Sequence, residues 1–327
     1  MSDRAARSIA AMAEPEIVAE IVRSGFVEGH HHGSVVALDP DGGVAWSVGA
    51  VEDDMFPRSC NKPLQAVALL RAGWTAPPES IALASASHSG ESVHVDVVRA
   101  ILAEAGLDES ALQNPADYPL DDAVREQAVR AGQLRRPVLM NCSGKHAAML
   151  ATCVANGWDT ATYLEPEHPL QVLIRDVVGE LVERPIVRQG VDGCGAPLLA
   201  TSLVGLARAF RRLALATEGP ERDVAEAIRT HPLLVSGTRR DELALHRAVP
   251  GLIGKAGAES CYAVALPDGR AVALKIDDGA PRARPVVMAA ALARLGLDAD
   301  AVHATGRHPL YGGGAQVGEI RAAGALA

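Results

Sequence analysis

A serine and a lysine three positions apart are the first residues of this chain whose types and spacing could do chemistry. In Ser59-Cys60-Asn61-Lys62, side chains at i and i+3 share one face of a helical turn. A neutral lysine there can accept the proton of the serine hydroxyl and so activate it for attack on a carbonyl carbon. The stretch therefore indicates an acyl-transfer enzyme, although Ser59 could also serve only as a helix cap.

The proline that follows Lys62 predicts where this pair lies. Pro63 lacks an N–H and is accepted in the first turn of a helix, and an apolar run over 64–70 follows it. Ser59 is therefore expected at the N-terminal end of a helix, where unpaired N–H groups and the helix dipole favour a developing oxyanion. The same field, together with burial, favours the neutral form of Lys62 that a general base requires.

Four further segments combine small residues with groups that could act on or hold a ligand. They are 84–91 (ASASHSGE), 141–146 (NCSGKH), 191–197 (VDGCGAP) and 254–259 (GKAGAE). The first lets a ligand approach the backbone closely, or it caps the next helix. The last places a lysine in a glycine-rich turn before a strand, like the K-T-G element of the penicillin-recognising enzymes, but an ordinary solvated turn has the same composition.

Two of the cysteines lie in polar loops that each precede a helix-like run. The chain has an odd number of cysteines at irregular spacing, so no disulfide framework is expected. Thiolates of Cys142 and Cys194 could hold a soft divalent metal such as zinc, with Lys145 or His146 as a third ligand. No C-x-x-C knuckle is present, so such a site would keep an open position. A catalytic or a simply buried cysteine fits the same pattern.

The composition narrows the possible partners and the location. The 327 residues are 48% hydrophobic and carry a net charge of −9, which argues against nucleic acid or an anionic membrane as a partner. No apolar run reaches the roughly 18–20 residues of a membrane span. The short apolar stretch before Glu14 makes a poor export signal. We therefore expect a cytoplasmic protein.

The pattern of elements predicts one antiparallel sheet built from both ends of the chain. Hairpins are expected at 34–48 and 261–276, and helices between and after them at 97–105, 145–155, 169–181, 197–209 and 285–295. This indicates an α+β sandwich in a single domain, 1–327. Its sheet lobe would take about 16–56 and 252–327, and its mostly helical lobe about 60–250. No G-x-G-x-x-G follows a strand, which argues against a dinucleotide site.

In their order along the chain, these motifs resemble the Rhizobium etli type L-asparaginases of the bacterial asparaginase II family. The resemblance also covers 22–33 (VRSGFVEGHHHG), so the three histidines are native sequence. It implies a fold similar to the serine β-lactamases and glutaminases, a homodimer, and hydrolysis of L-asparagine to L-aspartate and ammonia.

The resemblance also implies roles for individual residues. The nucleophile would be Ser59 with Lys62 as its partner, and Ser87 with Lys255 would form a second pair. Zinc would be held by Cys142, Lys145 and Cys194, with Asp192 beside them, and is expected to position groups without generating the nucleophile. We also expect Asp192, His146 and Arg239 to contact the substrate, and Arg239 is selected on its chemistry alone, because a guanidinium suits a carboxylate. Ser89 competes with Ser87, Lys275 with Lys255, and Arg240 with Arg239 as a partner for the substrate carboxylate.

Three other functions share part of this pattern. A glutaminase or another small-amide hydrolase would use the same machinery. A penicillin-interacting enzyme would share the fold and S-x-x-K, but it should be exported. A zinc-binding or zinc-sensing module that is not an enzyme would bind the metal and form no acyl-enzyme.

Overall fold

The sheet of this protein takes its strands from both ends of the chain. The computed structural model describes residues 16–327, so the poor export signal before Glu14 lies outside the described residues. The N-terminal strands are β1 (Glu16–Arg23), β2 (Phe26–Leu38) and β3 (Val44–Val48). The C-terminal strands are β6 (Ile253–Ala256), β7 (Cys261–Ala265), β8 (Ala271–Ile276), β9 (His308–Gly312) and β10 (Ala315–Ala322).

These strands pair in the order β6-β7-β8-β2-β1-β10-β9, with β3 also on β2, and the pairs are antiparallel. The two predicted hairpins, β2–β3 and β7–β8, are confirmed. The α+β class, with a sheet assembled from both termini, is confirmed with them. The β9–β10 hairpin was not expected, because its glycine-rich turn and short strands carry little alternation of apolar and polar residues.

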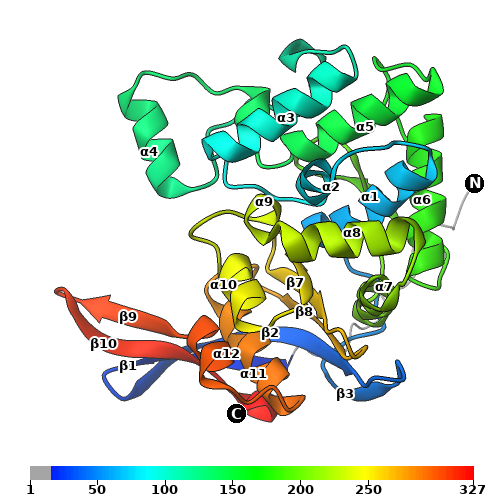
Figure 1. Ribbon diagram of the computed structural model, residues 1–327. Coiled ribbons are helices and arrows are strands. Elements are labelled where there is room, and N and C mark those ends of the chain that lie inside the picture. Colours follow the sequence, from blue (N-terminus) through cyan, green and yellow to red (C-terminus); the bar gives the residue numbers. More distant parts are fainter. Residues whose placement is uncertain (1–15) are drawn as a thin grey trace, which may run out of the picture.

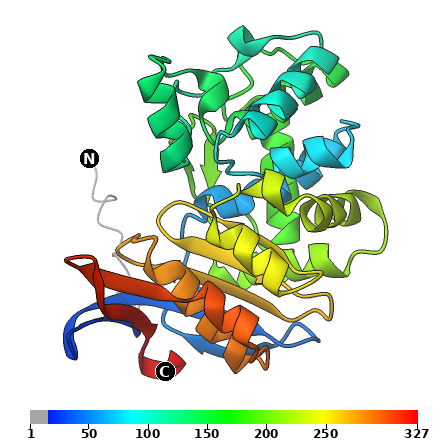
Figure 2. The ribbon, with the colours of Figure 1, turned by 60° about the vertical axis from the view of Figure 1, so that its left-hand side comes forward.

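Alternation along the strands gives the sheet two buried faces. Val36 and Leu38 belong to the core shared with the helices on one side, and Val35 and Ala37 belong to the core on the other side. Helix α7 (Leu203–Leu215) contacts β2, β7 and β8 on the first face, and α11 (Ala283–Arg294) contacts β8 and β10 on the second. Figures 1 and 2 show the sheet between these layers.

The middle of the chain forms the helical part above the sheet (Figure 1). Its helices are α1 (Lys62–Arg71), α2 (Pro78–Ala84), α3 (Ser92–Glu104), α4 (Asp122–Arg130), α5 (Ser143–Asn156), α6 (Pro169–Leu181), α8 (Gly219–Thr230) and α9 (Pro232–Val235). Helix α10 (Asp241–Ala248) instead contacts β6, and Leu245 of this helix belongs to the core on the second face of the sheet. Gly157 ends α5 with φ of 65°, as expected of a glycine C-cap. Helix α12 (Asp300–Thr305) follows α11.

One predicted helix, 197–209, is wrong at its start. Pro197–Leu199 forms strand β5, which pairs with β4 (Gln189–Val191). The helix begins at Leu203, because the Ser202 side chain accepts a hydrogen bond from the N–H of Gly205 at 3.1 Å and so caps the first turn. The proline that suggested a helix start begins the short strand instead.

Candidate active site

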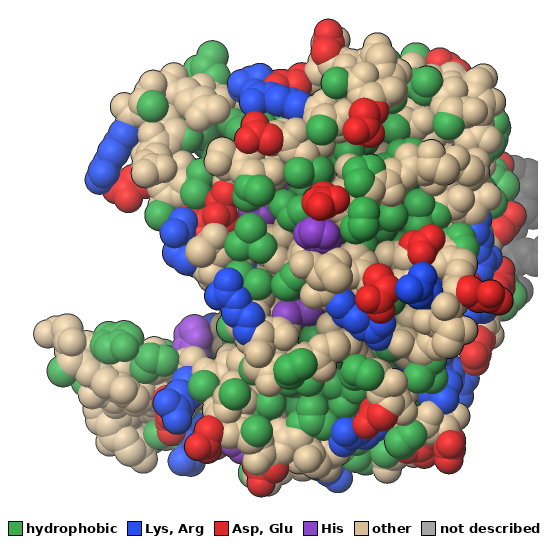
Figure 3. Space-filling model, in the orientation of Figure 1, with side chains coloured by type: hydrophobic (Ala, Val, Ile, Leu, Met, Phe, Trp, Pro, Cys, Tyr) green, Lys and Arg blue, Asp and Glu red, His purple; other side chains and the backbone are tan. Residues whose placement is uncertain are grey.

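A cavity of about 800 Å³ lies where the helical part meets the sheet. Figure 3 shows the molecule hollowed on its left side, between α4 above and the β9–β10 hairpin below. The lining comes from loops far apart in the sequence and includes Ser59, Ser87, Asp122, Asn141, Arg239, Gly257, Ala258, Glu259, Arg282 and His308. Several of the motifs singled out in the sequence therefore meet in one place.

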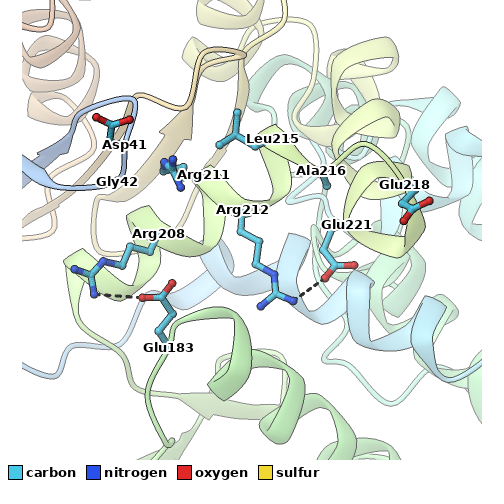
Figure 4. Close-up of a pocket in the computed structure, with 10 residues that line it drawn as sticks. All are labelled: Asp41, Gly42, Glu183, Arg208, Arg211, Arg212, Leu215, Ala216, Glu218 and Glu221. Carbon is cyan, nitrogen blue, oxygen red and sulfur yellow. Dashed lines mark hydrogen bonds and ion pairs between the residues drawn. The ribbon is translucent and has the colours of Figure 1, made fainter.

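Another hollow, on the outer side of α7, holds none of these motifs. It has a volume of about 690 Å³ and is lined by arginines of α7, by Glu221 of α8 and by acids of neighbouring loops (Figure 4). Arg208 Nη1 contacts Glu183 Oε2 at 3.3 Å and Arg212 Nη2 contacts Glu221 Oε1 at 3.2 Å. Two of its arginines are therefore paired with acids, and among the residues that the structure describes its lining includes no serine, cysteine or lysine that could act as a nucleophile.

Ser59 lies in the 3-10 turn η1 (Arg58–Asn61), directly before α1. Pro63 occupies the first turn of α1, so the predicted position at the helix mouth is confirmed. Gly257 packs against this turn, and a Cβ added there would come within 3.1 Å of the Ser59 and Cys60 nitrogens and 2.6 Å of the Pro57 oxygen. Only glycine fits this close approach without moving the backbone that carries Ser59.

Two backbone N–H groups near the Ser59 side chain have no hydrogen-bond partner in the described part of the chain. Within residues 16–327, neither the Ser59 N–H nor the Ala258 N–H has a hydrogen-bond acceptor, and both residues line the cavity. The N–H of Gly257 is used by the Cys261 oxygen at 2.8 Å. The pair has the composition of an oxyanion hole, with one donor from Ser59 and one from the turn after β6.

Lys62 is buried beneath the cavity, between the η1 turn and Ser87. Its Nζ donates to the Ala86 oxygen at 2.5 Å and to Ser87 Oγ at 3.1 Å, and it contacts Cys142 Sγ at 3.1 Å. In the described part of the chain, Ser59 Oγ and Lys62 Nζ are not hydrogen-bonded. Catalytic hydrogen bonds of this kind commonly tighten only when substrate is bound.

The two serines after α2 have different surroundings. Ser87 lines the cavity, whereas Ser89 is completely buried. A Cβ at Gly237 would meet Ser89 Oγ at 2.0 Å, so the 237 backbone covers that hydroxyl. The structure therefore brings Ser87, and not Ser89, to the cavity. Burial, followed by the charge of His94, holds the pKa of neighbouring His88 well below its usual value, so that ring is neutral.

Lys255 is paired with a carboxylate that the sequence analysis did not select. Its Nζ donates to Glu242 Oε1 at 3.1 Å and to the Ala256 oxygen, and both charged side chains are 0% exposed. Burial lowers the pKa of Lys255, and the charge of Glu242 opposes that shift. The expected Ser87–Lys255 hydrogen bond is absent from the described residues, where Lys62 contacts Ser87 instead.

Glu242 also holds the strand that carries Lys255. It accepts from the Ala256 N–H at 3.0 Å and from Arg240 Nη2 at 2.7 Å. Burial works to raise the pKa of the Glu242 carboxyl, but the charges of Lys255, Arg240 and Arg284 hold it below its usual value. Lys275, the alternative to Lys255, instead donates to the Glu259 oxygen at 2.6 Å and supports the loop backbone.

The residues predicted to hold zinc do meet. Cys142 and Cys194 are both buried, and Lys145 Nζ lies 3.2 Å from Cys194 Sγ. Interaction with Cys142 lowers the pKa of Cys194, while burial opposes this shift. Residues 16–327 hold no metal-binding group of three or more His, Cys, Asp and Glu side chains, but two sulfurs with an amine are a donor set that suits zinc.

Of the three expected substrate contacts, only Arg239 lines the cavity. His146 is fully buried, with its Nδ1 2.7 Å from the Tyr163 hydroxyl, and it does not line the cavity. Asp192 also lies outside the lining and accepts from Arg58 Nε at 2.8 Å. Arg239 does line the cavity, but its guanidinium is already bound to the Asp121 carboxylate, with Nε–Oδ2 at 2.8 Å.

Strained backbone surrounds the η1 turn that carries Ser59. Arg58, Glu259 and Ser260 have φ of 50°, 54° and 49°, each costing about 1–3 kcal/mol. Arg58 bridges Asp192 to Glu259, whose Oε1 lies 3.5 Å from its Nη1. Strain of this kind concentrates at functional sites. The sequence carries no signal for it, because none of these residues is a glycine.

Comparisons with known proteins give one family match and several structures of similar fold. The family model described as L-asparaginase II matches residues 19–322. The comparison with curated proteins finds no match. Among solved structures, a beta-lactamase from Mycobacterium bovis is similar at 13% identity, covering 76% of this chain and 88% of that one with a TM-score of 0.40. A Bacillus glutaminase is similar at 12% identity, covering 75% and 83%, also with a TM-score of 0.40.

Proposed function

Since this chain belongs to the L-asparaginase II family, a family of amide hydrolases, we propose that it hydrolyses L-asparagine to L-aspartate and ammonia through an ester on Ser59. The observation that carries the proposal is the cavity itself. Ser59 lines it beside two free N–H groups, and Lys62 lies buried against Ser87 just behind it. The family match does not separate the Rhizobium etli type from other members, so that subdivision is part of the proposal.

The first half of the reaction forms the ester. Ser59 Oγ attacks the side-chain amide carbon, and its proton passes to the Lys62 amine, directly or through the Ser87 hydroxyl that Lys62 contacts at 3.1 Å. The N–H groups of Ser59 and Ala258 stabilise the negative oxygen. The carbon–nitrogen bond then breaks, the proton on Lys62 moves to the leaving nitrogen, and ammonia departs.

The second half uses the same groups on water. Lys62 accepts a proton from a water molecule, whose oxygen attacks the ester carbon. The adduct collapses, Ser59 Oγ takes back the proton, and L-aspartate is released. Lys255 has a positioning role in this proposal. Its ion pair with Glu242 holds the strand that leads to Ala258.

We further propose that Cys142, Lys145 and Cys194 hold a zinc ion. The buried sulfurs and amine already lie together, and Lys62 contacts Cys142 at 3.1 Å. A zinc ion held by two thiolates is a weak Lewis acid, so its contribution would be to join the start of α5 to the 191–195 loop. This joining would keep Cys142 in place against Lys62.

Ammonia release from asparagine and from glutamine, measured with and without a chelator, tests the proposal. We expect faster release from asparagine, and about one zinc per chain by elemental analysis of the untreated protein. Chelation should remove the metal and lower the thermal midpoint, because the ion binds only the folded chain. Preference for glutamine would favour the glutaminase alternative. No release from either amide, with zinc bound, would favour the zinc-binding module.

Two further points follow the family resemblance. We propose a homodimer, which a mass measurement by light scattering would check, and a monomeric mass would refute it.

No helix within residues 16–327 combines the length and apolarity needed to cross a membrane. The cytoplasmic location expected from the sequence stays a prediction, and cell fractionation tests it. Covalent labelling by a β-lactam would instead support the penicillin-interacting alternative.

A further inference from the structure

The cavity is lined by several cations, and most of them are already neutralised. Arg239 is bound to Asp121. Arg240 donates to Glu242 at 2.7 Å, and Arg284 donates to Asp241 with Nε–Oδ2 at 3.1 Å. If one of these arginines bound the carboxylate of a ligand, the Asp or Glu that it now contacts would lose its partner. These arginines are therefore poor groups for binding a ligand.

Arg282 is different. It lines the same cavity, its side chain is exposed, and within residues 16–327 its guanidinium forms no hydrogen bond or ion pair. The nearby Asp278 carboxylate is engaged elsewhere, with His31 Nδ1 at 2.6 Å and the Ala280 N–H at 2.8 Å. Arg282 therefore offers its planar fork of donors to the cavity without giving up a partner.

The backbone around Arg282 is tied to the loop beside the nucleophile. Ser260 Oγ donates to the Gly279 oxygen at 3.0 Å, and a Cβ at Gly279 would meet Glu259 Oε2 at 2.4 Å. The 257–260 loop in turn packs on the Ser59 turn through Gly257. Segment 279–282, which leads into α11, is thus held at a defined place relative to Ser59.

His308 of β9 completes this end of the cavity. Arg282 and His308 both line this part of the cavity. Burial lowers the pKa of His308, and the Arg282 charge lowers it further. Among the arginines that line the cavity, Arg282 is the one without a hydrogen bond or ion pair in the part of the chain that the structure describes. The Ser59 end, by contrast, offers a nucleophile and two backbone donors.

We propose that Arg282 binds the α-carboxylate of the substrate, so that the enzyme selects amides of free α-amino acids over simple amides. This inference rests on the proposed function. Asparagine carries its α-carboxylate two carbons from the reacting amide carbon. An arginine held on a separate loop can bind that carboxylate while Ser59 attacks the amide. The sequence analysis favoured Arg239 and Arg240 for this role, and their existing ion pairs argue against them.

Kinetics on a matched pair of amides tests the assignment. 3-Aminopropanamide is asparagine without its α-carboxylate. For Arg282→Gln, kcat/KM for asparagine should fall about 10- to 100-fold, mainly through KM, because a charge-assisted hydrogen bond is lost. Turnover of 3-aminopropanamide should not change, and inhibition by L-aspartate should weaken to a similar degree. Arg282→Lys should recover part of the loss. Arg222→Gln, at an exposed arginine of α8 outside the cavity, is the control.

Several results would overturn the inference. One is that Arg282→Gln leaves asparagine kinetics and aspartate inhibition unchanged. Another is that Arg282→Gln lowers kcat/KM equally for both amides. A third is that Arg239→Gln, and not Arg282→Gln, shows the loss that depends on the carboxylate. Aspartate inhibition decides the matter if 3-aminopropanamide is turned over too slowly to measure. A wild-type enzyme that binds L-aspartate in an Arg282-dependent way but releases no ammonia from asparagine would refute the proposed function and leave the carboxylate site standing.

Discussion

Ser59→Ala is expected to lower kcat for asparagine roughly a thousandfold or more, because removing the nucleophile of an acyl-transfer site leaves only substrate binding and the oxyanion donors. The side chain is small and lies at the cavity, so the fold and the thiol cluster should be unaffected. Ammonia release gives the rate. Intact mass after rapid quenching should show an added aspartyl group on the wild type and none on the variant.

Two neighbouring serines supply a matched control for this experiment. Ser87→Ala removes the hydroxyl that Lys62 contacts and should also lower kcat. Ser89→Ala removes a hydroxyl that is buried behind Gly237 and should leave kcat close to that of the wild type. Residual turnover by Ser59→Ala near the wild-type rate would contradict the nucleophile assignment. Equal losses in both neighbours would contradict the placement of Ser87.

Glu242→Ala is expected to destabilise the protein by about 3–5 kcal/mol, because it leaves the buried Lys255 ammonium without its partner. The loss should be measured as the free energy of unfolding in urea. Since its pKa is lowered, Glu242 stabilises the fold while ionised at neutral pH, and this contribution is lost as the pH falls through the lowered value. Ala256 would lose the acceptor for its N–H in the same variant.

The control for this variant is an exposed ion pair on α4. Glu126 and Arg130 are one helical turn apart and more than half exposed, so Glu126→Ala should cost at most about 0.5 kcal/mol. The double variant Glu242→Leu with Lys255→Met removes both buried charges and should recover much of the lost stability. An unfolding free energy for Glu242→Ala equal to that of Glu126→Ala would show that the buried pair is not important for stability.

Local sequence is sufficient to predict the parts of the site that depend on one turn. Pro63 can only begin a helix here, so the position of Ser59 before α1 follows from steric rules. The hairpins follow from their turn residues in the same way. The strand at Pro197–Leu199 was missed because pairing with β4 decides its conformation. The residues of one short segment do not indicate which other segment it pairs with.

The rest of the site depends on contacts between distant segments. Ser87 and Ser89 differ because the backbone of Gly237 covers one of them. In the sequence, Arg239-Arg240-Asp241-Glu242 has the pattern of a solvated charge cluster, yet Glu242 is buried under Lys255. Arg282 stands out only once the partners of every other arginine in the cavity are known. Such facts need the tertiary structure, because the partners lie far away along the chain.

The pairing of β2 with β8 has a consequence for synthesis on the ribosome. Leu38 pairs with Ala271, so an N-terminal strand waits until about 230 further residues have been added. At about 5–20 residues per second, this takes roughly 10–50 s. Throughout that time the nascent chain carries an unpaired strand edge and an uncovered apolar face. A chaperone that shields β1–β3 during this time should therefore raise the yield of active protein.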